Sequence, residues 1–336
     1  MIFEDLPTTP RSSELIDKAF SRAARAGRAK AGREAQESML RTAASILADN
    51  VENVVRAWPD FGTVDPFYRE VADAVLRVET DPREDADGEQ VGLDALRASL
   101  SELTWASRQV RDLRQEYVSK VRTADAATAR KHRKQAFARM ADVIEEVAAD
   151  LARVGAARDA LRDLPDIRPD EPTVAVAGYP NVGKSSFVNR VSRAKNEVAA
   201  YPFTTTGVRV GHVERDRVRY QVVDTPGLLD RPADERNGIE RQAASAVDHL
   251  ADVVLFLVDA SEACGYPLDA QLALRDDLAA AFDAPVLTVC NKSDRSTAVD
   301  ADDYMSVETG EGVERVLAAA VEAVDYEPDI PASRRE

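Results

Sequence analysis

Apolar residues recur every three or four positions through the first half of the chain, as expected for helices that bury one face. Residues 34–57 carry such a stripe, which stops before Pro59 because proline cannot continue a helix. A shorter stripe covers residues 66–78, and two long ones cover residues 93–121 and about 126–162. We predict an all-α bundle whose apolar positions form its core, with no cofactor among them.

Two polar residues and two segments depart from this helical pattern. Ser107 and Arg114 place polar side chains on the apolar stripe of residues 93–121. Residues 80–90 (TDPREDADGEQ) are acidic, contain turn-forming residues and offer little to bury, so we predict a loop there. Residues 164–172 contain three prolines and mark the end of the helical part.

Beyond residue 172 the pattern changes to short runs rich in β-branched residues, separated by helical stretches. This alternation predicts an α/β fold with a mostly parallel, six-stranded sheet. Five strands are predicted at residues 173–178, 208–213, 220–224, 253–259 and 285–290. The predicted domains are an N-terminal helical bundle over 1–168, an α/β domain over 169–326 and a short C-terminal tail over 327–336.

Composition narrows the class of protein. Of the 336 residues 44% are apolar, which is enough for two domains with proper cores. No apolar run is long enough to span a membrane and the first residues lack a signal sequence, so we expect a cytoplasmic protein. Cys264 and Cys290 lack metal-site spacing and are expected to be reduced, buried thiols. The formal charge of −16, together with few lysines and many alanines, resembles the composition of proteins adapted to high salt.

Residues 178–185 (GYPNVGKS) match the phosphate-binding P-loop, directly after a predicted strand and before a predicted helix. The glycines let backbone N–H groups surround phosphate oxygens, and the helix N-terminus adds a favourable dipole. Lys184 can reach the β- and γ-phosphates, and the Ser185 hydroxyl can ligate Mg²⁺. The match alone would also suit an ATPase. The predicted phosphate-binding residues are Gly178, Tyr179, Pro180, Asn181, Val182, Gly183, Lys184, Ser185 and Ser186.

The second motif, residues 224–227 (DTPG), ends a hydrophobic strand. Asp224 suits an indirect contact to magnesium, and the Gly227 N–H can sense the γ-phosphate. An aspartate that ends a strand before such a turn is otherwise common, but its position after the P-loop favours the nucleotide interpretation. We therefore include Thr225 and Pro226 in the predicted nucleotide site.

The third motif, residues 291–294 (NKSD), indicates which base is bound. Guanine offers N1–H and N2–H₂ donors on one edge, and the Asp294 carboxylate can accept from both. Adenine presents an acceptor at N1 and would leave the carboxylate unpaired, which costs about 1–3 kcal/mol or more. GTP is therefore favoured over ATP, with Lys292 over the base and Asn291 tying the loop to the P-loop. Ser306 and Val307 are predicted to supply a backbone N–H to the guanine oxygen.

These motifs follow the order of a G domain, and residues 201–206 (YPFTTT) resemble the switch I sequence of Obg-related GTPases. The resemblance implies that Thr205 joins Mg²⁺ in the GTP state and that Phe203 and Thr204 lie beside the nucleotide. Longer strings, among them GYPNVGKSSFVNRV, WASRQVRDLRQEYV and DASEACGYPLDAQL, resemble the nucleolar GTP-binding protein 1 family over nearly the whole chain. The implied cofactors are GTP or GDP and Mg²⁺.

The resemblance also implies partners. Members of this family act in assembly of the large ribosomal subunit, so we expect that subunit or its precursor, and its rRNA, as partners, with no membrane and no DNA. Eukaryotic members continue far beyond the G domain, whereas this chain ends about ten residues after its last predicted helix. Functions of that extension are therefore not carried over.

Hydrolysis of GTP needs charge neutralisation and a positioned water. The predicted catalytic residues are Lys184, Thr205, Gly227 and Asn181. Many G proteins use a glutamine directly after the DxxG sequence to orient water, but Leu228 stands there, so slow hydrolysis is expected. In related GTPases an asparagine at the position of Asn181 helps hold K⁺, which we hypothesise here; the alternative is that Asn181 only shapes the loop.

Two segments are rich in arginine and poor in acids. Residues 18–33 hold six Lys or Arg and no acid, and residues 105–140 hold ten against three. They are candidates for binding rRNA phosphates, and the alternatives are a solvated helix face or ion pairs within the chain. The favoured interpretation is a slow GTPase switch whose helical domain docks on the large-subunit precursor. A module with structural GTP and a signalling G protein with protein partners remain alternatives.

Overall fold

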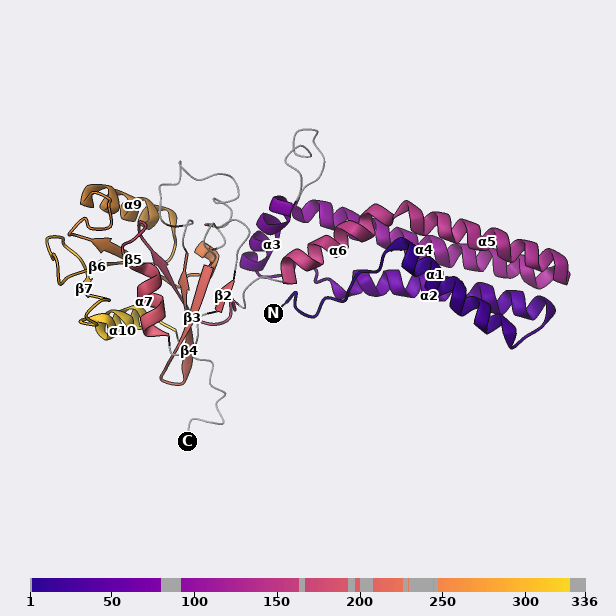
Figure 1. The fold of residues 1–336 in the computed structure, drawn as a ribbon, viewed down its shortest axis with the longest axis horizontal. Helices are drawn as coiled ribbons and strands as arrows, with labels where there is room; N and C mark the ends of the chain where they lie inside the picture. The colour runs from indigo at the N-terminus through magenta and orange to yellow at the C-terminus, as the bar shows by residue number, and fades with distance from the viewer. Residues whose placement is uncertain are drawn as a thin grey trace. The chain divides into compact units, whose positions relative to one another are not determined.

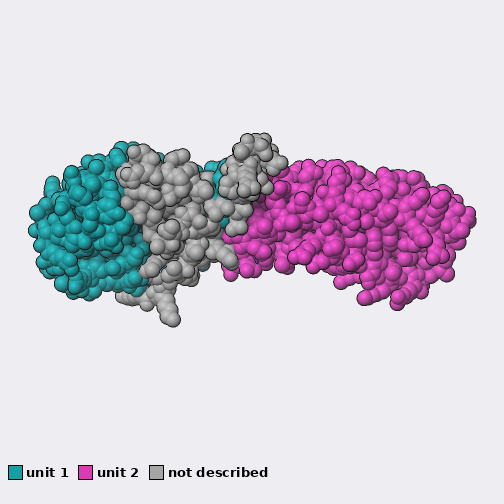
Figure 2. All heavy atoms as spheres, turned by 45° about the horizontal axis from the view of Figure 1, so that its top comes forward, with its two compact units in different colours: residues 1, 63–79, 163–336 teal, residues 2–62, 80–162 magenta. Residues whose placement is uncertain are grey.

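The computed structural model describes residues 2–79, 92–162, 167–192, 197–199, 208–225, 229, 244 and 247–326. The chain divides into two compact units, which Figure 2 colours separately. The helical unit comprises Ile2–Gly62 and Thr80–Arg162, and the sheet unit comprises Thr63–Glu79 and Asp163–Glu336. Neither unit is one continuous stretch of chain. The predicted domain boundary at residue 168 stays a prediction.

The helical unit consists of long helices that lie side by side (Figure 1), as the all-α prediction requires. Helix α2 packs against α1 and α4, and α4 also packs against α5 and α6. The predicted stripes form the core: Leu40, Leu47, Leu103 and Ile144 are fully buried. The helices are α1 (Ser12–Arg28), α2 (Gly32–Ala57), α4 (Gly92–Thr123), α5 (Ala126–Glu146) and α6 (Ala148–Arg162).

The last predicted helix of this unit, about residues 126–162, is two helices. Val147 leaves the helical conformation with φ −96° and ψ 19°, and its N–H donates to the carbonyl of Glu145 instead of continuing the ladder. The apolar stripe runs through the break, since Ile144, Val147 and Leu151 are all buried. Periodicity alone therefore carried no sign of the interruption.

Local chemistry sets two other helix ends. Trp58 takes an extended conformation with ψ 140° and ends α2, as expected for the residue before a proline. Asp125 caps α5, because its side chain accepts a hydrogen bond from the Thr128 N–H at 2.9 Å.

Ser107, one of the two polar residues on the α4 stripe, is buried and donates to the Ala48 carbonyl of α2 at 3.2 Å.

The sheet unit contains one sheet with strand order β2-β3-β4-β1-β5-β6-β7. Strand β1 pairs in parallel with β4 and β5, β6 pairs in parallel with β5 and β7, and β3 pairs antiparallel with β2 and β4. The strands are β1 (Thr173–Ala177), β2 (Glu197–Ala199), β3 (Val208–Arg215), β4 (Val218–Asp224), β5 (Val253–Asp259), β6 (Val286–Asn291) and β7 (Asp303–Tyr304).

The predicted α/β fold with a mostly parallel sheet is confirmed, and all five located strands are present within two residues. Over the described residues the sheet has seven strands, where six were predicted. The difference comes from the edges, where β2 has three residues and β7 has two. Such short segments give no alternation that a sequence can reveal. The predicted loop over 80–90 and the tail over 327–336 lie outside the described residues.

Helices cover both faces of this sheet. In β5, Val253, Leu255 and Leu257 belong to the core cluster shared with helices α7 (Lys184–Val191) and α10 (Val313–Ala323). The alternate β5 residues point to the opposite face, because successive strand side chains alternate. Helix α9 (Leu268–Ala281) packs against β5 and β6 without contributing to that cluster, so it covers the other face. Every residue of β1 and β5 is buried between these layers.

Helix α3 (Pro66–Glu79) belongs to the sheet unit although it lies between helices of the other unit in sequence. The Tyr68 hydroxyl donates to the Ile167 carbonyl at 2.5 Å. The Nε2 atom of His249 lies 3.1 Å from Oε1 of Glu70. These contacts attach α3 to segments that flank the sheet.

Candidate nucleotide-binding site

Four loops carry polar residues at the carboxyl ends of neighbouring strands. The P-loop follows β1, Asp224 ends β4, Asp259 ends β5 and Asn291 ends β6. These strands are parallel and adjacent, so their carboxyl ends meet at one edge of the sheet. That edge, where connections leave a central strand in opposite directions, is the usual ligand position in open α/β folds.

The P-loop backbone requires glycine at two positions. Gly178 has φ +128°, and a Cβ there would lie 2.5 Å from the Leu257 carbonyl oxygen. Gly183 has φ +109°, and a Cβ there would collide with the Asn291 amide. Gly183 also caps α7, and Asn181 adopts a left-handed φ of +64° that asparagine tolerates. The loop thus brings backbone N–H groups and a helix N-terminus to one place, which suits a phosphate.

Lys184 and Ser185 are the first residues of α7 and point into this region. Lys184 is buried, and its Nζ donates to the carbonyls of Gly178 at 2.6 Å and Tyr179 at 3.0 Å. The Ser185 hydroxyl donates to Oδ2 of the fully buried Asp224 at 2.5 Å. A hydroxyl and a carboxylate oxygen are hard ligands of the kind that Mg²⁺ prefers, so the residues present fit this ion.

Asn291 connects three loops. Its Nδ2 donates to the Val182 carbonyl of the P-loop at 2.7 Å, and its Oδ1 accepts from the Val307 N–H at 3.1 Å. The amide is almost fully buried, so both hydrogen bonds are protected from water. The predicted tie between the NKSD loop and the P-loop therefore matches this geometry.

The remaining base-recognition residues lie around Asn291. The Asp294 carboxylate is partly exposed, and its Oδ2 is 3.9 Å from Nε of Arg295. The Ser306 N–H donates to the Glu311 carbonyl at 2.9 Å, and the Val307 N–H is held by Asn291. Both N–H groups predicted to bind the guanine oxygen are thus engaged within the protein, and their contact with a base stays a prediction.

Sequence reasoning missed Asp259, which has no exposed surface. Its Oδ2 lies 2.6 Å from Nζ of Lys292, and its Oδ1 accepts from the Ser261 N–H and hydroxyl. Burial alone would raise the pKa of this carboxyl, but the hydrogen bonds from Lys292 and Ser261 outweigh it and hold the pKa below its ordinary value. The available signal was its position at the carboxyl end of a central strand.

The segment after β5 is fixed against the P-loop. Gln271 of α9 is buried, accepts from the Asp259 N–H at 2.8 Å and donates to the Tyr266 carbonyl at 2.9 Å. The Tyr266 ring packs on the Tyr179 ring of the P-loop with centroids 4.4 Å apart. One chain of contacts therefore links Lys292, through Asp259 and Tyr266, to the loop that precedes Lys184.

The other predicted site residues divide into two groups. Thr225 is buried and donates its hydroxyl to the Val176 carbonyl at 3.2 Å, while Pro180 and Ser186 lie within the P-loop and α7. The switch residues Phe203, Thr204, Thr205, Pro226, Gly227 and Leu228 lie outside the described residues. Cys264 and Cys290 are free, buried thiols, as predicted, and burial raises the pKa of both.

Two family models match the chain and together cover most of it. The family described as "NOG1 N-terminal helical domain" matches residues 3–168, and the family described as "50S ribosome-binding GTPase" matches residues 173–292. The chain belongs to the nucleolar GTP-binding protein 1 family. As a member of this family it is a GTP-binding protein.

The relatives differ in length. An uncharacterized protein of Methanocaldococcus jannaschii is 37% identical over 302 residues, which cover 87% of this chain and 81% of that protein. Nucleolar GTP-binding protein 1 of Drosophila melanogaster is 34% identical over 254 residues, which cover 75% of this chain and 37% of that protein. The Saccharomyces cerevisiae protein of that name is 32% identical over 250 residues, covering 74% and 36%. The chain thus spans little more than a third of these two nucleolar family members.

Within the described part of the chain, none of the helices combines the length and apolar character needed to cross a bilayer.

Proposed function

We propose that this protein hydrolyses GTP slowly to GDP and phosphate and acts as a nucleotide-controlled switch in assembly of the large ribosomal subunit. The observation that carries the proposal is the Asn291 amide, which joins the base-recognition loop to the P-loop through Val182 and to the last loop through Val307. Base recognition and phosphate binding are thereby mechanically connected. The names of the nucleolar relatives and of the matching GTPase family support the ribosomal role.

Selectivity for guanine would come from Asp294. Its carboxylate is partly exposed, and its Oδ2 lies 3.9 Å from Nε of Arg295, so it keeps acceptor capacity for the N1–H and N2–H₂ donors of guanine. Lys292 would cover the base while Asp259 holds its ammonium in place. A site built to pair with these donors rejects adenine, which lacks them.

Charge neutralisation would come from the P-loop. Lys184 and the N–H groups at the start of α7 would bind the phosphates, and Ser185, Asp224 and Thr205 would hold Mg²⁺, which neutralises phosphate charge when bound. Leu228 replaces the glutamine that orients water in many G proteins. We therefore expect slow hydrolysis, with Asn181 holding K⁺ as an additional cation.

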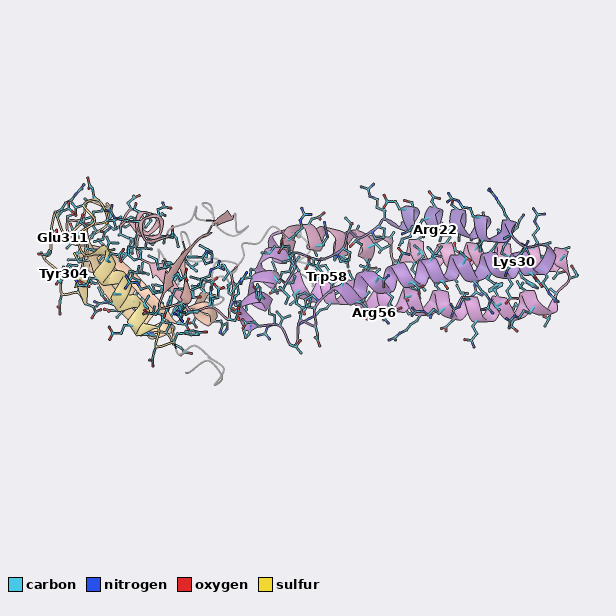
Figure 3. All side chains as sticks on the ribbon, turned by 90° about the horizontal axis from the view of Figure 1, so that it is seen from below. Arg22, Lys30, Arg56, Trp58, Tyr304 and Glu311 are labelled. Carbon is cyan, nitrogen blue, oxygen red and sulfur yellow. The ribbon has the colours of Figure 1, made fainter. Side chains whose placement is uncertain are left out.

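Docking on rRNA would use the exposed cations of α1. Arg22, Arg25 and Arg28 of α1 and Lys30, which follows the helix, are exposed, and their side chains form no hydrogen bond or ion pair with other described residues. Figure 3 labels two of them, Arg22 and Lys30, on the helical unit. These side chains are thus available to phosphates. We also propose that the protein is cytoplasmic, as expected from the sequence.

The second arginine-rich segment, residues 105–140, differs from the first in how its cations are paired. Several of its cations are paired within the helical unit: Arg111 with Glu52, Lys120 with Glu116, and Arg139 also with Glu116. Ion pairing within the chain, one of the alternatives weighed above, therefore accounts for these three residues. The proposal for rRNA rests on α1.

Co-sedimentation with purified large ribosomal subunits tests the proposal. The full chain is mixed with subunits at high KCl, with GDP or with a non-hydrolysable GTP analogue. Association that the analogue strengthens supports an assembly switch. No association with either nucleotide, or equal association with both, contradicts it.

Leu228 also favours a second candidate function, a module in which GTP is structural and rarely hydrolysed. Multiple-turnover kinetics separate the two. Steady release of phosphate over many turnovers supports the switch, and a single turnover followed by a stop supports the structural role.

A further inference from the structure

A polar groove of about 490 Å³ opens on the helical unit at the seam between α2 and α4. Six of its seven lining residues carry side-chain hydrogen-bond donors, and none is acidic. Its volume lies in the range of ligand pockets. The lining residues are Arg41, Arg114, Gln115, Val118, Ser119, Arg122 and Thr123. We refer to it as the arginine groove.

Arg114 is an unusual residue for its position. It stands on the core-facing stripe of α4, between the buried residues Val110 and Tyr117, where the pattern calls for an apolar side chain. Its guanidinium is partly buried and donates to the Ser45 hydroxyl at 3.3 Å. Among the described residues it pairs with no carboxylate. A partly desolvated cation is costly without an anionic partner, so its placement points to an anion from outside the chain.

The other two arginines of the groove share one acid. Glu37 accepts from Nε of Arg41 and from Nη2 of Arg122, both at 2.9 Å. The groove therefore holds three guanidinium groups, of which Glu37 pairs with two, so it keeps a net positive charge. Glu37 also fixes the direction of two of the cations before any ligand arrives, which lowers the entropic cost of binding.

The donor set selects the ligand chemistry. A guanidinium presents a planar fork of N–H groups that matches two oxygens of a phosphate. Gln115, Ser119 and Thr123 add neutral donors around the same space, and Val118 provides a mostly buried apolar wall. We propose that the arginine groove is a phosphate-binding site and that it takes a backbone phosphate of RNA. The choice of RNA rests on the proposed function, whereas the phosphate site itself does not.

This site differs from the exposed cations of α1. At high salt, charges that are fully exposed are screened strongly and partly buried ones much less. A contact made by Arg114 should therefore persist at KCl concentrations that weaken contacts made by Arg25 or Arg28. The groove would give the protein a phosphate contact with a defined position instead of a diffuse attraction.

The test uses the full chain saturated with GDP and Mg²⁺, so that the P-loop is occupied. Pyrophosphate and a 12-base-pair RNA duplex are titrated separately into wild type and Arg114→Gln at low and high KCl. Arg108→Gln is the matched control, because Arg108 lies on the same helix, is exposed and does not line the groove. GDP affinity and thermal melting report whether the variants fold.

We expect Arg114→Gln to weaken binding of both probes about tenfold or more and Arg108→Gln to change it less than twofold. For RNA this loss should remain at high KCl, because the partly buried contact is screened much less than the exposed ones. Arg114→Lys should restore part of the affinity, since it keeps the charge and loses the fork. Equal effects of Arg108→Gln and Arg114→Gln, or no pyrophosphate binding by wild type, would overturn the site.

Two further outcomes distinguish the source of the phosphate. Weaker pyrophosphate binding with unchanged RNA binding would support the phosphate site and overturn RNA as its ligand. If wild type fails to associate with ribosomal subunits while Arg114→Gln loses RNA duplex binding, the groove stands and the proposed ribosomal function fails. The two ideas can therefore fail separately.

Discussion

Lys292 of the NKSD loop lies 2.6 Å from the buried carboxylate of Asp259, a residue 33 positions earlier in the sequence. Lys292 itself has a left-handed backbone, with φ +56°. Asp259 also receives hydrogen bonds from Ser261 and from the Cys264 N–H, so it cannot move without disturbing its own loop. The lysine predicted to cover the base is thus held by an acid that has no role in the known motif.

Replacing Asp259 by asparagine should reduce affinity for GDP and GTP about tenfold. The change removes the charge that orients Lys292 and places an amide against donors from Ser261 or Cys264, which costs about 1–3 kcal/mol. Fluorescent-nucleotide titration measures the effect. Asp269→Asn is the control, because Asp269 is exposed at the start of α9. Equal affinity of Asp259→Asn and wild type would show that the pair does not position the lysine.

The same carboxyl should make stability depend on pH in the acid range. Its pKa is lower in the folded protein than in the unfolded chain, so its stabilising contribution is complete above the ordinary Asp value of about 3.9 and is lost as pH falls through the folded value. Denaturation of wild type and Asp259→Asn should therefore differ at pH 7 and converge towards acid pH. A difference that grew on acidification would contradict the assignment.

Asp294→Asn should change the preferred base. Asparagine offers one acceptor and one donor, so it loses a hydrogen bond to guanine and gains one to xanthine, which has a carbonyl in place of the 2-amino group. GTP affinity should fall at least tenfold and XTP affinity should rise. Competition binding with the two nucleotides measures the switch, and loss of both would indicate that the loop had unfolded.

Alanine substitutions at two glycines with left-handed backbones measure backbone strain with and without a steric clash. Gly183→Ala adds a Cβ that meets the Asn291 amide, whereas a Cβ at Gly265 (φ +93°) meets no atom within 4 Å. Gly265→Ala should cost about 1 kcal/mol from backbone strain alone. Gly183→Ala should lower the melting temperature further and abolish GDP binding, because it breaks the tie from Asn291 to Val182. Similar behaviour of the two variants would argue against that tie.

Asn181→Gly tests the hypothesis of a potassium site. Glycine adopts the left-handed φ of +64° without cost, so the loop keeps its shape and loses only the side chain. If Asn181 holds K⁺, turnover of wild type should drop when Na⁺ replaces K⁺, and Asn181→Gly should be slow in both salts with GDP affinity unchanged. Cation-dependent turnover in the variant would favour the alternative in which Asn181 only shapes the loop.

Neutralising Arg22, Arg25 and Arg28 to glutamine should weaken association with large subunits about tenfold while sparing GTP binding. Each removed phosphate contact reduces binding and its salt dependence. The control triple changes Arg56, Arg97 and Arg153, which form ion pairs with Glu52, Asp94 and Asp150 of the same unit. Co-sedimentation should distinguish the triples, and equal losses would mean that overall charge, not α1, determines association.

Short motifs in the sequence predicted several residues of the candidate site. Gly178, Gly183 and Asn291 could be assigned because only their residue types suit a left-handed turn or a tie between loops. Asp259 could not, because its partner Lys292 becomes its neighbour only when β5 and β6 pair. Long-range pairing leaves no trace at a fixed sequence spacing.

The same limit explains which parts of the fold could be predicted from the sequence. Stripes such as Leu40 to Val51 identified long helices because each residue adds to one periodic signal. The two residues of β7 and the break at Val147 are too local to alter such a signal. The assignment of α3 to the sheet unit depends on Tyr68 and Glu70, whose partners lie about a hundred or more residues away.

The course of the chain between its two units restricts how they can be separated. The chain passes from one unit to the other between residues 62 and 63, again between 79 and 80, and a third time between 162 and 163. A single proteolytic cut at one of these passages leaves two covalent connections intact. For the same reason, no single truncation of the chain yields either unit whole and separate from the other.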